Sequence, residues 1–195
     1  MQKYSVFSLI KNAFTDHQNW EVAWKDPTPK SEYDVVIIGG GGHGLATAYY
    51  LAKEHNITNV AVIEKGWIGG GNVGRNTTII RSNFMYDANA RFNEFGMDLW
   101  RNLSQELNFN VMFSPRGIIN LAHSDAQMNA YARRGNSMRL NGIDAKLLNR
   151  DEVKKLIPMA DFSDEVRFPI FGGLMQPSAG TARHDGVAWG YARQA

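Results

Sequence analysis

The chain has 195 residues, a formal net charge of +2 and 44% hydrophobic residues, which is enough for one sizeable core, or for one domain and part of another. No run of lysine and arginine exceeds a pair, so nothing indicates nucleic acid or an anionic membrane as a partner. There is no cysteine, which excludes disulfides, thiolate metal sites and a cysteinyl cofactor link within these residues. The longest apolar run is far too short to span a membrane.

Residues 1–30 predict an N-terminal arm. Apolar residues between Val6 and Ala13 recur at helical spacing, which favours a short amphipathic helix. Trp20 and Trp24 then precede a connector with two prolines; they either pack within the arm, cover the main fold or bind a partner subunit. Charged residues interrupt the apolar positions, which argues against a secretory signal.

The stretch from Tyr33 to Asn83 organises the chain. An apolar run at 35–38, a glycine cluster at 39–44, a helical segment and a second apolar run at 60–63 follow one another. This order predicts a strand, a tight turn, a helix and a second parallel strand.

The glycine cluster reads G-x-G-x-x-G, with Gly39, Gly41 and Gly44 at the three positions. The first glycine permits the sharp turn, the second permits close approach of a pyrophosphate, and the third permits close packing of helix and strand. Glu64 follows the second strand, at the place where a carboxylate binds the ribose hydroxyls. The pattern therefore favours FAD or NAD over NADP, and the alternative is a glycine turn that binds nothing.

A glycine-rich loop at 66–74 replaces the helix that a simple NAD domain would have next. Its exposed N–H groups suit a second wrap around a long dinucleotide, with Asn76 and Thr77 as hydrogen-bond partners. The loop therefore favours a flavin dinucleotide, and the alternative is a flexible surface loop.

The remaining chain predicts a helix with an apolar stripe at 92–107 and then a smaller cap region. Short strands are expected at 111–113 and 118–122, joined by a turn, and a strand at 143–148. Ser124 is expected to cap one helix, and Asp151 begins another.

From Phe171 the glycines and Pro177 predict a loop, which becomes helical near Asp185. His184 lies at this junction, where a histidine serves as a cap, a packed residue or a reactive group. The predicted fold is an α/β, Rossmann-like FAD-binding domain of the glutathione-reductase type with a mixed α+β substrate or cap domain. Its expected parts are an arm at 1–32, the FAD-binding domain at 33–110, the cap at 111–181 and a return to the FAD-binding domain at 182–195. Because no helix stop follows, the C-terminal part of the fold is expected to be missing and the chain to be the front of a longer one.

Five segments carry a resemblance to a known family. They are HQNWEVAWKDPTPK, IIGGGGHGLATAYYLA, VIEKGWIGGGNVGRNTTIIRSN, SPRGIINLAHS and GTARHDGVAWGYAR. In this order, over nearly the whole sequence, they resemble the N-terminal half of the beta subunits of heterotetrameric sarcosine oxidases, which are amine-oxidising FAD-dependent oxidoreductases.

The resemblance implies two flavins. Non-covalent FAD would lie on the glycine turn, and FMN would be joined through its 8α carbon to His184, with Arg183 beside it able to stabilise negative charge on the ring. The implied FAD-binding residues are Gly39, Gly41, Gly42, His43, Gly44, Glu64, Lys65, Asn72, Asn76, Thr77 and Ile79.

The resemblance further implies oxidative demethylation of sarcosine, in which electrons pass from FAD to FMN and then to oxygen. Hydrogen peroxide and glycine are the products, with formaldehyde, or 5,10-methylenetetrahydrofolate when tetrahydrofolate captures the carbon. A cation must bind the carboxylate of sarcosine, for which Arg81 is the first candidate and Arg75 the second; a structural ion pair is the alternative role for both.

The implied partners are alpha, gamma and delta subunits in the cytoplasm, with NAD bound only on the alpha subunit. Two alternatives stay open: a related FAD-dependent amine or amino-acid dehydrogenase with a single flavin, and a non-catalytic dinucleotide-binding assembly subunit.

Overall fold

The computed structural model describes residues 5–16, 18 and 28–195, and divides the chain into the units Met1–Tyr33 and Asp34–Ala195. In the first unit the predicted helix is confirmed as α1 (Val6–Phe14). The side chain of Ser5 caps it by accepting a hydrogen bond from the backbone N–H of Ser8. None of the helix residues is buried. The predictions for Trp20 and Trp24 lie outside the described residues.

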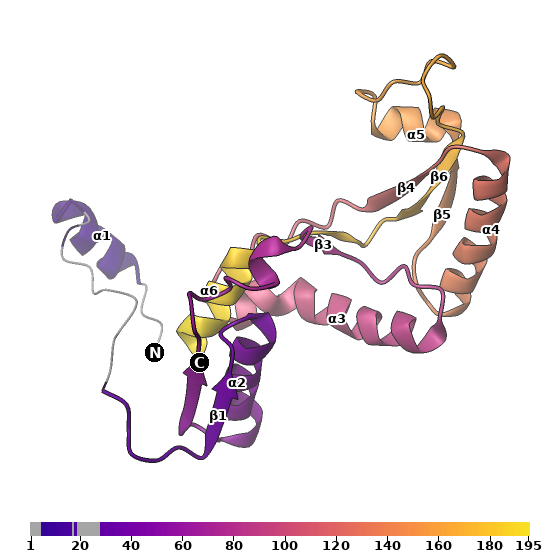
Figure 1. Ribbon diagram of the computed structural model, residues 1–195. Coiled ribbons are helices and arrows are strands. Elements are labelled where there is room, and N and C mark those ends of the chain that lie inside the picture. The colour runs from indigo at the N-terminus through magenta and orange to yellow at the C-terminus, as the bar shows by residue number, and fades with distance from the viewer. Residues whose placement is uncertain (1–4, 17, 19–27) are drawn as a thin grey trace. The chain divides into compact units, whose positions relative to one another are not determined.

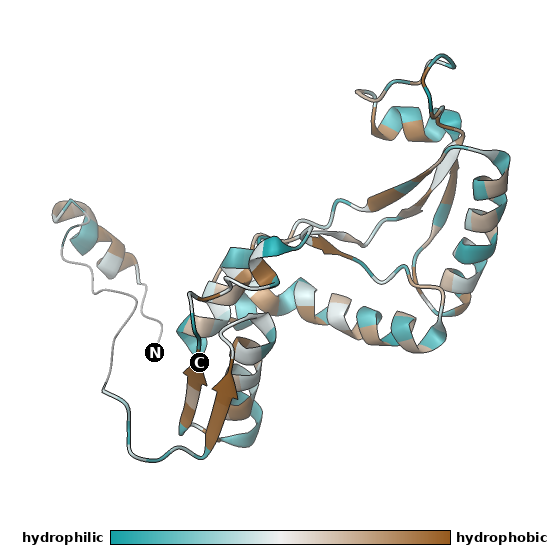
Figure 2. Cartoon of the chain, in the orientation of Figure 1, coloured by the Kyte–Doolittle hydropathy of each residue, from teal (hydrophilic) through white to brown (hydrophobic). Residues whose placement is uncertain are grey.

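The second unit begins with the predicted strand–helix–strand motif. Strands β1 (Val35–Ile38) and β2 (Val60–Ile63) are parallel, and α2 (Gly42–His55) connects them. Figure 2 shows both strands as strongly hydrophobic, in agreement with the two apolar runs. The prediction of a parallel unit that leads from the glycine turn to Glu64 is therefore confirmed.

A separate antiparallel sheet has the order β4-β6-β5. Its strands are β4 (Ile118–Ala122), β5 (Lys146–Asn149) and β6 (Gly172–Gln176). Helix α4 (Asp125–Leu140) packs along this sheet and α5 (Arg150–Leu156) lies at its end (Figure 1). Ser124 caps α4 as predicted, by accepting from the Gln127 N–H.

Two expectations for this region are wrong. Residues 172–176, expected in a loop, form the middle strand. A Cβ on Gly172 would lie 2.4 Å from the Leu148 carbonyl oxygen, so the neighbouring strand can approach this closely only because residue 172 is a glycine. Residues 111–113 form no strand and no hairpin with β4, since Met112 has a φ of +53°. The neighbouring Ser114 instead bridges to Thr181.

The parallel unit and the antiparallel sheet β4-β6-β5 are linked by α3 (Asp87–Glu106) and by the chain that follows β6 (Figure 1). That chain forms β7 (Gly180–Thr181), which pairs with β3 (Ile79–Ile80), and then α6 (His184–Gln194). A short 3-10 turn, η1 (Val73–Arg75), precedes β3. No helix among the described residues is long and apolar enough to cross a membrane.

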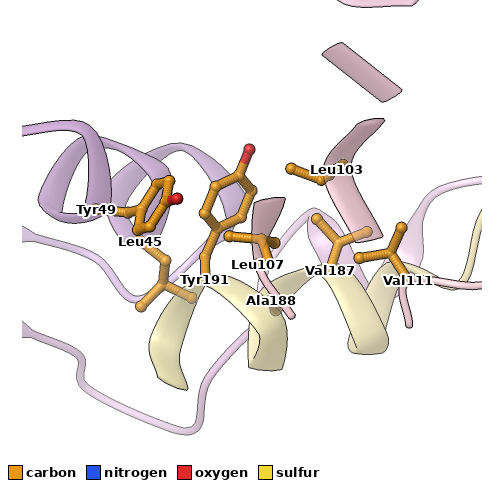
Figure 3. Close-up of a cluster of buried hydrophobic side chains, with 8 residues drawn as sticks. All are labelled: Leu45, Tyr49, Leu103, Leu107, Val111, Val187, Ala188 and Tyr191. Atoms are coloured by element: carbon orange, nitrogen blue, oxygen red, sulfur yellow. The ribbon is translucent and has the colours of Figure 1, made fainter. Parts of the chain in front are cut away.

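The main hydrophobic core joins α2, the end of α3 and α6 (Figure 3). Its members come from α2, α6, the end of α3 and the chain that follows α3: Leu45, Tyr49, Leu103, Leu107, Val111, Val187, Ala188 and Tyr191. Because α6 packs directly on α2, its first residue, His184, is held in the same unit as the glycine turn. The domain boundaries expected inside 34–195 stay predictions.

Candidate functional site

The glycine turn between β1 and α2 forms an open cradle. Gly39 has a φ of +108°, which favours glycine, and nothing lies within 4 Å of the place where its Cβ would be. A Cβ on Gly44 would lie 2.0 Å from the Gly39 carbonyl oxygen, so the third glycine is required for the helix to approach the strand. No side chain caps α2 at Gly41, so the N–H groups of its first turn are available to an anion. A pyrophosphate fits this cradle.

Glu64 closes the turn from the end of β2. Its carboxylate accepts hydrogen bonds from the Gly40 N–H at 2.7 Å and the Gly66 N–H at 2.9 Å. These two bonds hold the pKa of the Glu64 carboxyl below its usual value, and the bond from Gly66 has the larger effect. Glu64 therefore stays charged beside the cradle, where an adenosine ribose would present its hydroxyl groups. Lys65 follows it and is exposed.

The loop at 66–74 is tied to the cradle by a hydrogen bond from the Gly69 N–H to the Gly40 carbonyl, at 2.9 Å. The side chain of Asn76 is used within the loop, because it donates to the Val73 carbonyl and accepts from the Thr78 N–H. Asn72, Arg75 and Thr77 are exposed on this loop. The loop therefore lies beside the glycine turn, but the Asn76 side chain is hydrogen-bonded to the backbone of Val73 and Thr78.

Arg81 directly follows β3. Its guanidinium stacks on the Phe84 ring, with 4.9 Å between the Cζ atom and the ring centroid. It also donates a hydrogen bond to the Asn83 side-chain oxygen. Arg81 and Arg75, the two carboxylate candidates, therefore have different surroundings: Arg81 is half-buried and held in place, and Arg75 is exposed on the loop.

His184 lies in an open hollow of about 420 Å³ at the start of α6. Its Nδ1 atom is buried and has no hydrogen-bond partner in the described part of the chain. Arg183 forms an ion pair with Asp185 at 2.8 Å, so its charge is already compensated at the rim of the hollow. The volume falls within the range of small-molecule sites.

Two rim residues of this hollow have unfavourable backbone conformations. Thr78 and Met112 both have positive φ, +60° and +53°, and residues of these types rarely adopt such angles. The other non-glycine residues with positive φ among those described are asparagine or aspartate, which tolerate it. Such conformations concentrate at functional sites. No sequence signal marked Thr78 or Met112, because neither residue type predicts a positive φ.

The described residues thus contain two separate candidate regions. One combines a parallel strand–helix–strand unit, an open glycine cradle and a charged glutamate, and the other is the hollow at His184. The first region is typical of the nucleotide-binding segment of a dinucleotide-dependent protein.

Residues 34–195 match the family described as FAD dependent oxidoreductase. The chain belongs to this family, and its match supports FAD as the dinucleotide. The predicted family is thereby confirmed.

Curated relatives with high identity have one common name. The chain is 61% identical to sarcosine oxidase subunit beta of Rhizobium meliloti (strain 1021) over 193 residues, which cover 99% of this chain and 46% of the relative. It is 52% identical to the protein of the same name from Arthrobacter sp, over 90% of this chain and 43% of the relative. The resemblance to beta subunits is therefore confirmed. The chain spans about half the length of these relatives.

Among solved structures, L-proline dehydrogenase from P. horikoshii is similar with a TM-score of 0.74 and 29% sequence identity. The match covers 86% of this chain and 42% of that one. The predicted α/β fold class is thereby confirmed.

Proposed function

We propose that the protein acts as a beta-type subunit of a sarcosine oxidase and takes part in the oxidative demethylation of sarcosine. The products would be glycine and hydrogen peroxide, with formaldehyde or 5,10-methylenetetrahydrofolate. The observation that carries the proposal is the glycine cradle with the charged Glu64 beside it, in a chain with 61% identity to a sarcosine oxidase beta subunit.

When bound, FAD supplies a hydride acceptor for the C–H group beside the amine nitrogen. The chain's own contribution at this site is to hold the dinucleotide. The N–H groups at the start of α2 would bind the pyrophosphate, and Glu64 would accept hydrogen bonds from the ribose hydroxyls. The loop residues Asn72, Asn76, Thr77 and Ile79 stay proposed contacts of the dinucleotide.

We assign the carboxylate of the substrate to Arg81, because its guanidinium is half-buried and held by Asn83 and Phe84. A cation there binds the carboxylate and also disfavours the protonated form of the substrate amine. Arg75 is the second candidate; its exposure makes it the weaker one.

His184 is the proposed attachment site of a covalent FMN. The buried Nδ1 atom, without a partner among the described residues, and the adjoining hollow fit a group bonded to this ring. An imidazole nitrogen can add to the electrophilic methide at the flavin 8-methyl position. We place the subunit in a cytoplasmic complex with alpha, gamma and delta subunits, with NAD on the alpha subunit and tetrahydrofolate as a carbon acceptor.

Two measurements on the full-length protein in its native complex test this function. Addition of sarcosine without oxygen should bleach the flavin absorbance; a non-catalytic assembly subunit would show no bleaching. Acid precipitation should release FAD and leave the second flavin on the polypeptide.

His184→Ala should abolish the acid-stable flavin, whereas the matched control His55→Ala, at the exposed end of α2, should retain it. Release of all flavin from the unaltered protein would favour the related single-flavin dehydrogenase instead.

A further inference from the structure

One buried asparagine holds two arginines from different parts of the fold. Asn83 is fully buried. Its side-chain oxygen accepts from Arg81, while its backbone carbonyl accepts from both Nε and Nη2 of Arg134, the Nε contact at 3.2 Å. Arg81 follows β3 and Arg134 lies on α4, so Asn83 joins the chain after β3 to the helix on the second sheet.

Neither guanidinium has a carboxylate within ion-pair distance anywhere in the described residues. The nearby acid, Glu94, accepts instead from the Ser82 hydroxyl and pairs with Arg101. Burial lowers the pKa of Arg134, and the positive charge of Arg81 lowers it further. Tyr131 is the other titratable group that acts on Arg134. The pair therefore has an excess of positive charge, which an anion between or beside the two cations would relieve.

The backbone around Asn83 is firmly held. The Ser82 N–H donates to the Gln176 side chain at 3.1 Å, and the Gln176 amide donates back to the Ser82 hydroxyl at 2.6 Å. Ser82 and Gln176 are both fully buried. The Asn83 amide nitrogen is also buried and has no partner among the described residues, so the cluster retains one unused donor. Such a supported arrangement fixes a charged group in one orientation.

We propose that Arg81, Asn83 and Arg134 form a carboxylate-recognition cluster, in which Arg81 contacts the substrate carboxylate and Asn83 and Arg134 are positioning residues. This inference rests on the proposed function, which already assigns the substrate carboxylate to Arg81, and it adds Asn83 and Arg134 as the residues that position that guanidinium. Arg134 acts by clamping the Asn83 carbonyl with two N–H donors and by adding to the positive field.

The test compares Arg134→Lys with the matched control Arg133→Lys in the full-length protein within its native complex. Arg133 is the adjacent, exposed residue of α4. Acetate serves as a carboxylate probe and acetamide as its neutral counterpart, both measured by calorimetry. Because lysine cannot reproduce the double hydrogen bond of a guanidinium, Arg134→Lys should weaken acetate binding and raise the KM for sarcosine by roughly tenfold. Arg133→Lys should leave both unchanged, and acetamide should bind neither variant appreciably.

Arg134→Met provides a second measurement that a purely structural role would not affect. Removal of one positive charge favours the protonated amine of bound sarcosine. The midpoint of flavin reduction against pH should therefore move to higher pH. An unchanged midpoint would overturn the proposal, as would equal acetate affinities of Arg134→Lys and Arg133→Lys.

Different results would reject the proposed function and the carboxylate-recognition cluster. An unaltered protein that binds acetate but does not respond to sarcosine would reject the sarcosine assignment and support the cluster. One that is bleached by sarcosine but has no affinity for acetate would reject the cluster and leave the proposed function standing.

Discussion

Replacement of Gly44 by alanine tests whether the glycine cradle binds the dinucleotide. The new Cβ would lie 2.0 Å from the Gly39 carbonyl oxygen, whereas contacts below 3.0 Å essentially never occur. The turn and the start of α2 must therefore separate by about 1 Å, which is 3.0 minus 2.0. Leu45 and Tyr49 fix α2 in the core (Figure 3), so this shift costs about 1–3 kcal/mol. At about 1.4 kcal/mol for each factor of ten, FAD affinity should fall roughly 5-fold to 140-fold.

The assay is titration of the full-length apoprotein with FAD, followed by flavin fluorescence, with thermal unfolding measured in parallel. Gly96→Ala is the matched control, because it lies on α3, outside the loop proposed to contact the dinucleotide, and an added Cβ there meets nothing within 4 Å. It should bind FAD as the unaltered protein does. Equal FAD affinity of Gly44→Ala and Gly96→Ala would refute the assignment of the pyrophosphate to this turn.

Two further predictions concern Glu64 and the core. Glu64→Gln replaces one of the two acceptor oxygens with an NH2 group, so one of the two N–H groups loses its acceptor, and FAD binding should weaken roughly tenfold. Because folding lowers the pKa of the Glu64 carboxyl, its charged form stabilises the fold at pH values above its ordinary pKa of 4.5, and this stabilisation is lost as the pH falls through the pKa in the folded protein. Acidification should therefore reduce the difference in unfolding temperature between the unaltered protein and Glu64→Gln. A difference that does not change with pH would contradict this. Leu107→Ala, at a fully buried position, should reduce the free energy of unfolding by about 2–5 kcal/mol in denaturant titrations. Leu140→Ala, at an 87% exposed position, should change it by less than about 0.5 kcal/mol, and equal effects would show that the helices do not pack as described.

The parallel unit was predictable because its signals are local. Apolar runs, the G-x-G-x-x-G spacing and Glu64 all lie within one stretch, and each has a direct physical requirement. The middle strand β6 was not predictable in this way. Gly172 and Gly173 indicate a loop when the sequence is considered alone, but they are needed because neighbouring strands approach too closely for a side chain.

The candidate sites were predictable only in part. Arg81 and His184 came from a family resemblance, whereas Asn83 and Arg134, 51 residues apart, meet only in the folded chain. No periodicity marks a single arginine on a polar helix. The positive φ of Thr78 likewise occurs where its carbonyl accepts a hydrogen bond from the Ala182 N–H, a contact between distant segments.

The short ladder between β3 and β7 lies between the hollow at His184 and the cluster of Arg81, Asn83 and Arg134. Thr78 at the His184 hollow and Arg81 at the arginine cluster flank Ile79 and Ile80, a path of about 10 Å along an extended chain. Because side chains alternate along a strand, one inserted residue would rotate one of the two ends to the opposite face. Chimeras between related oxidoreductases should therefore exchange this segment as a whole, since a junction inside it would change the spacing between Arg81, the proposed carboxylate site, and His184, the proposed flavin attachment site.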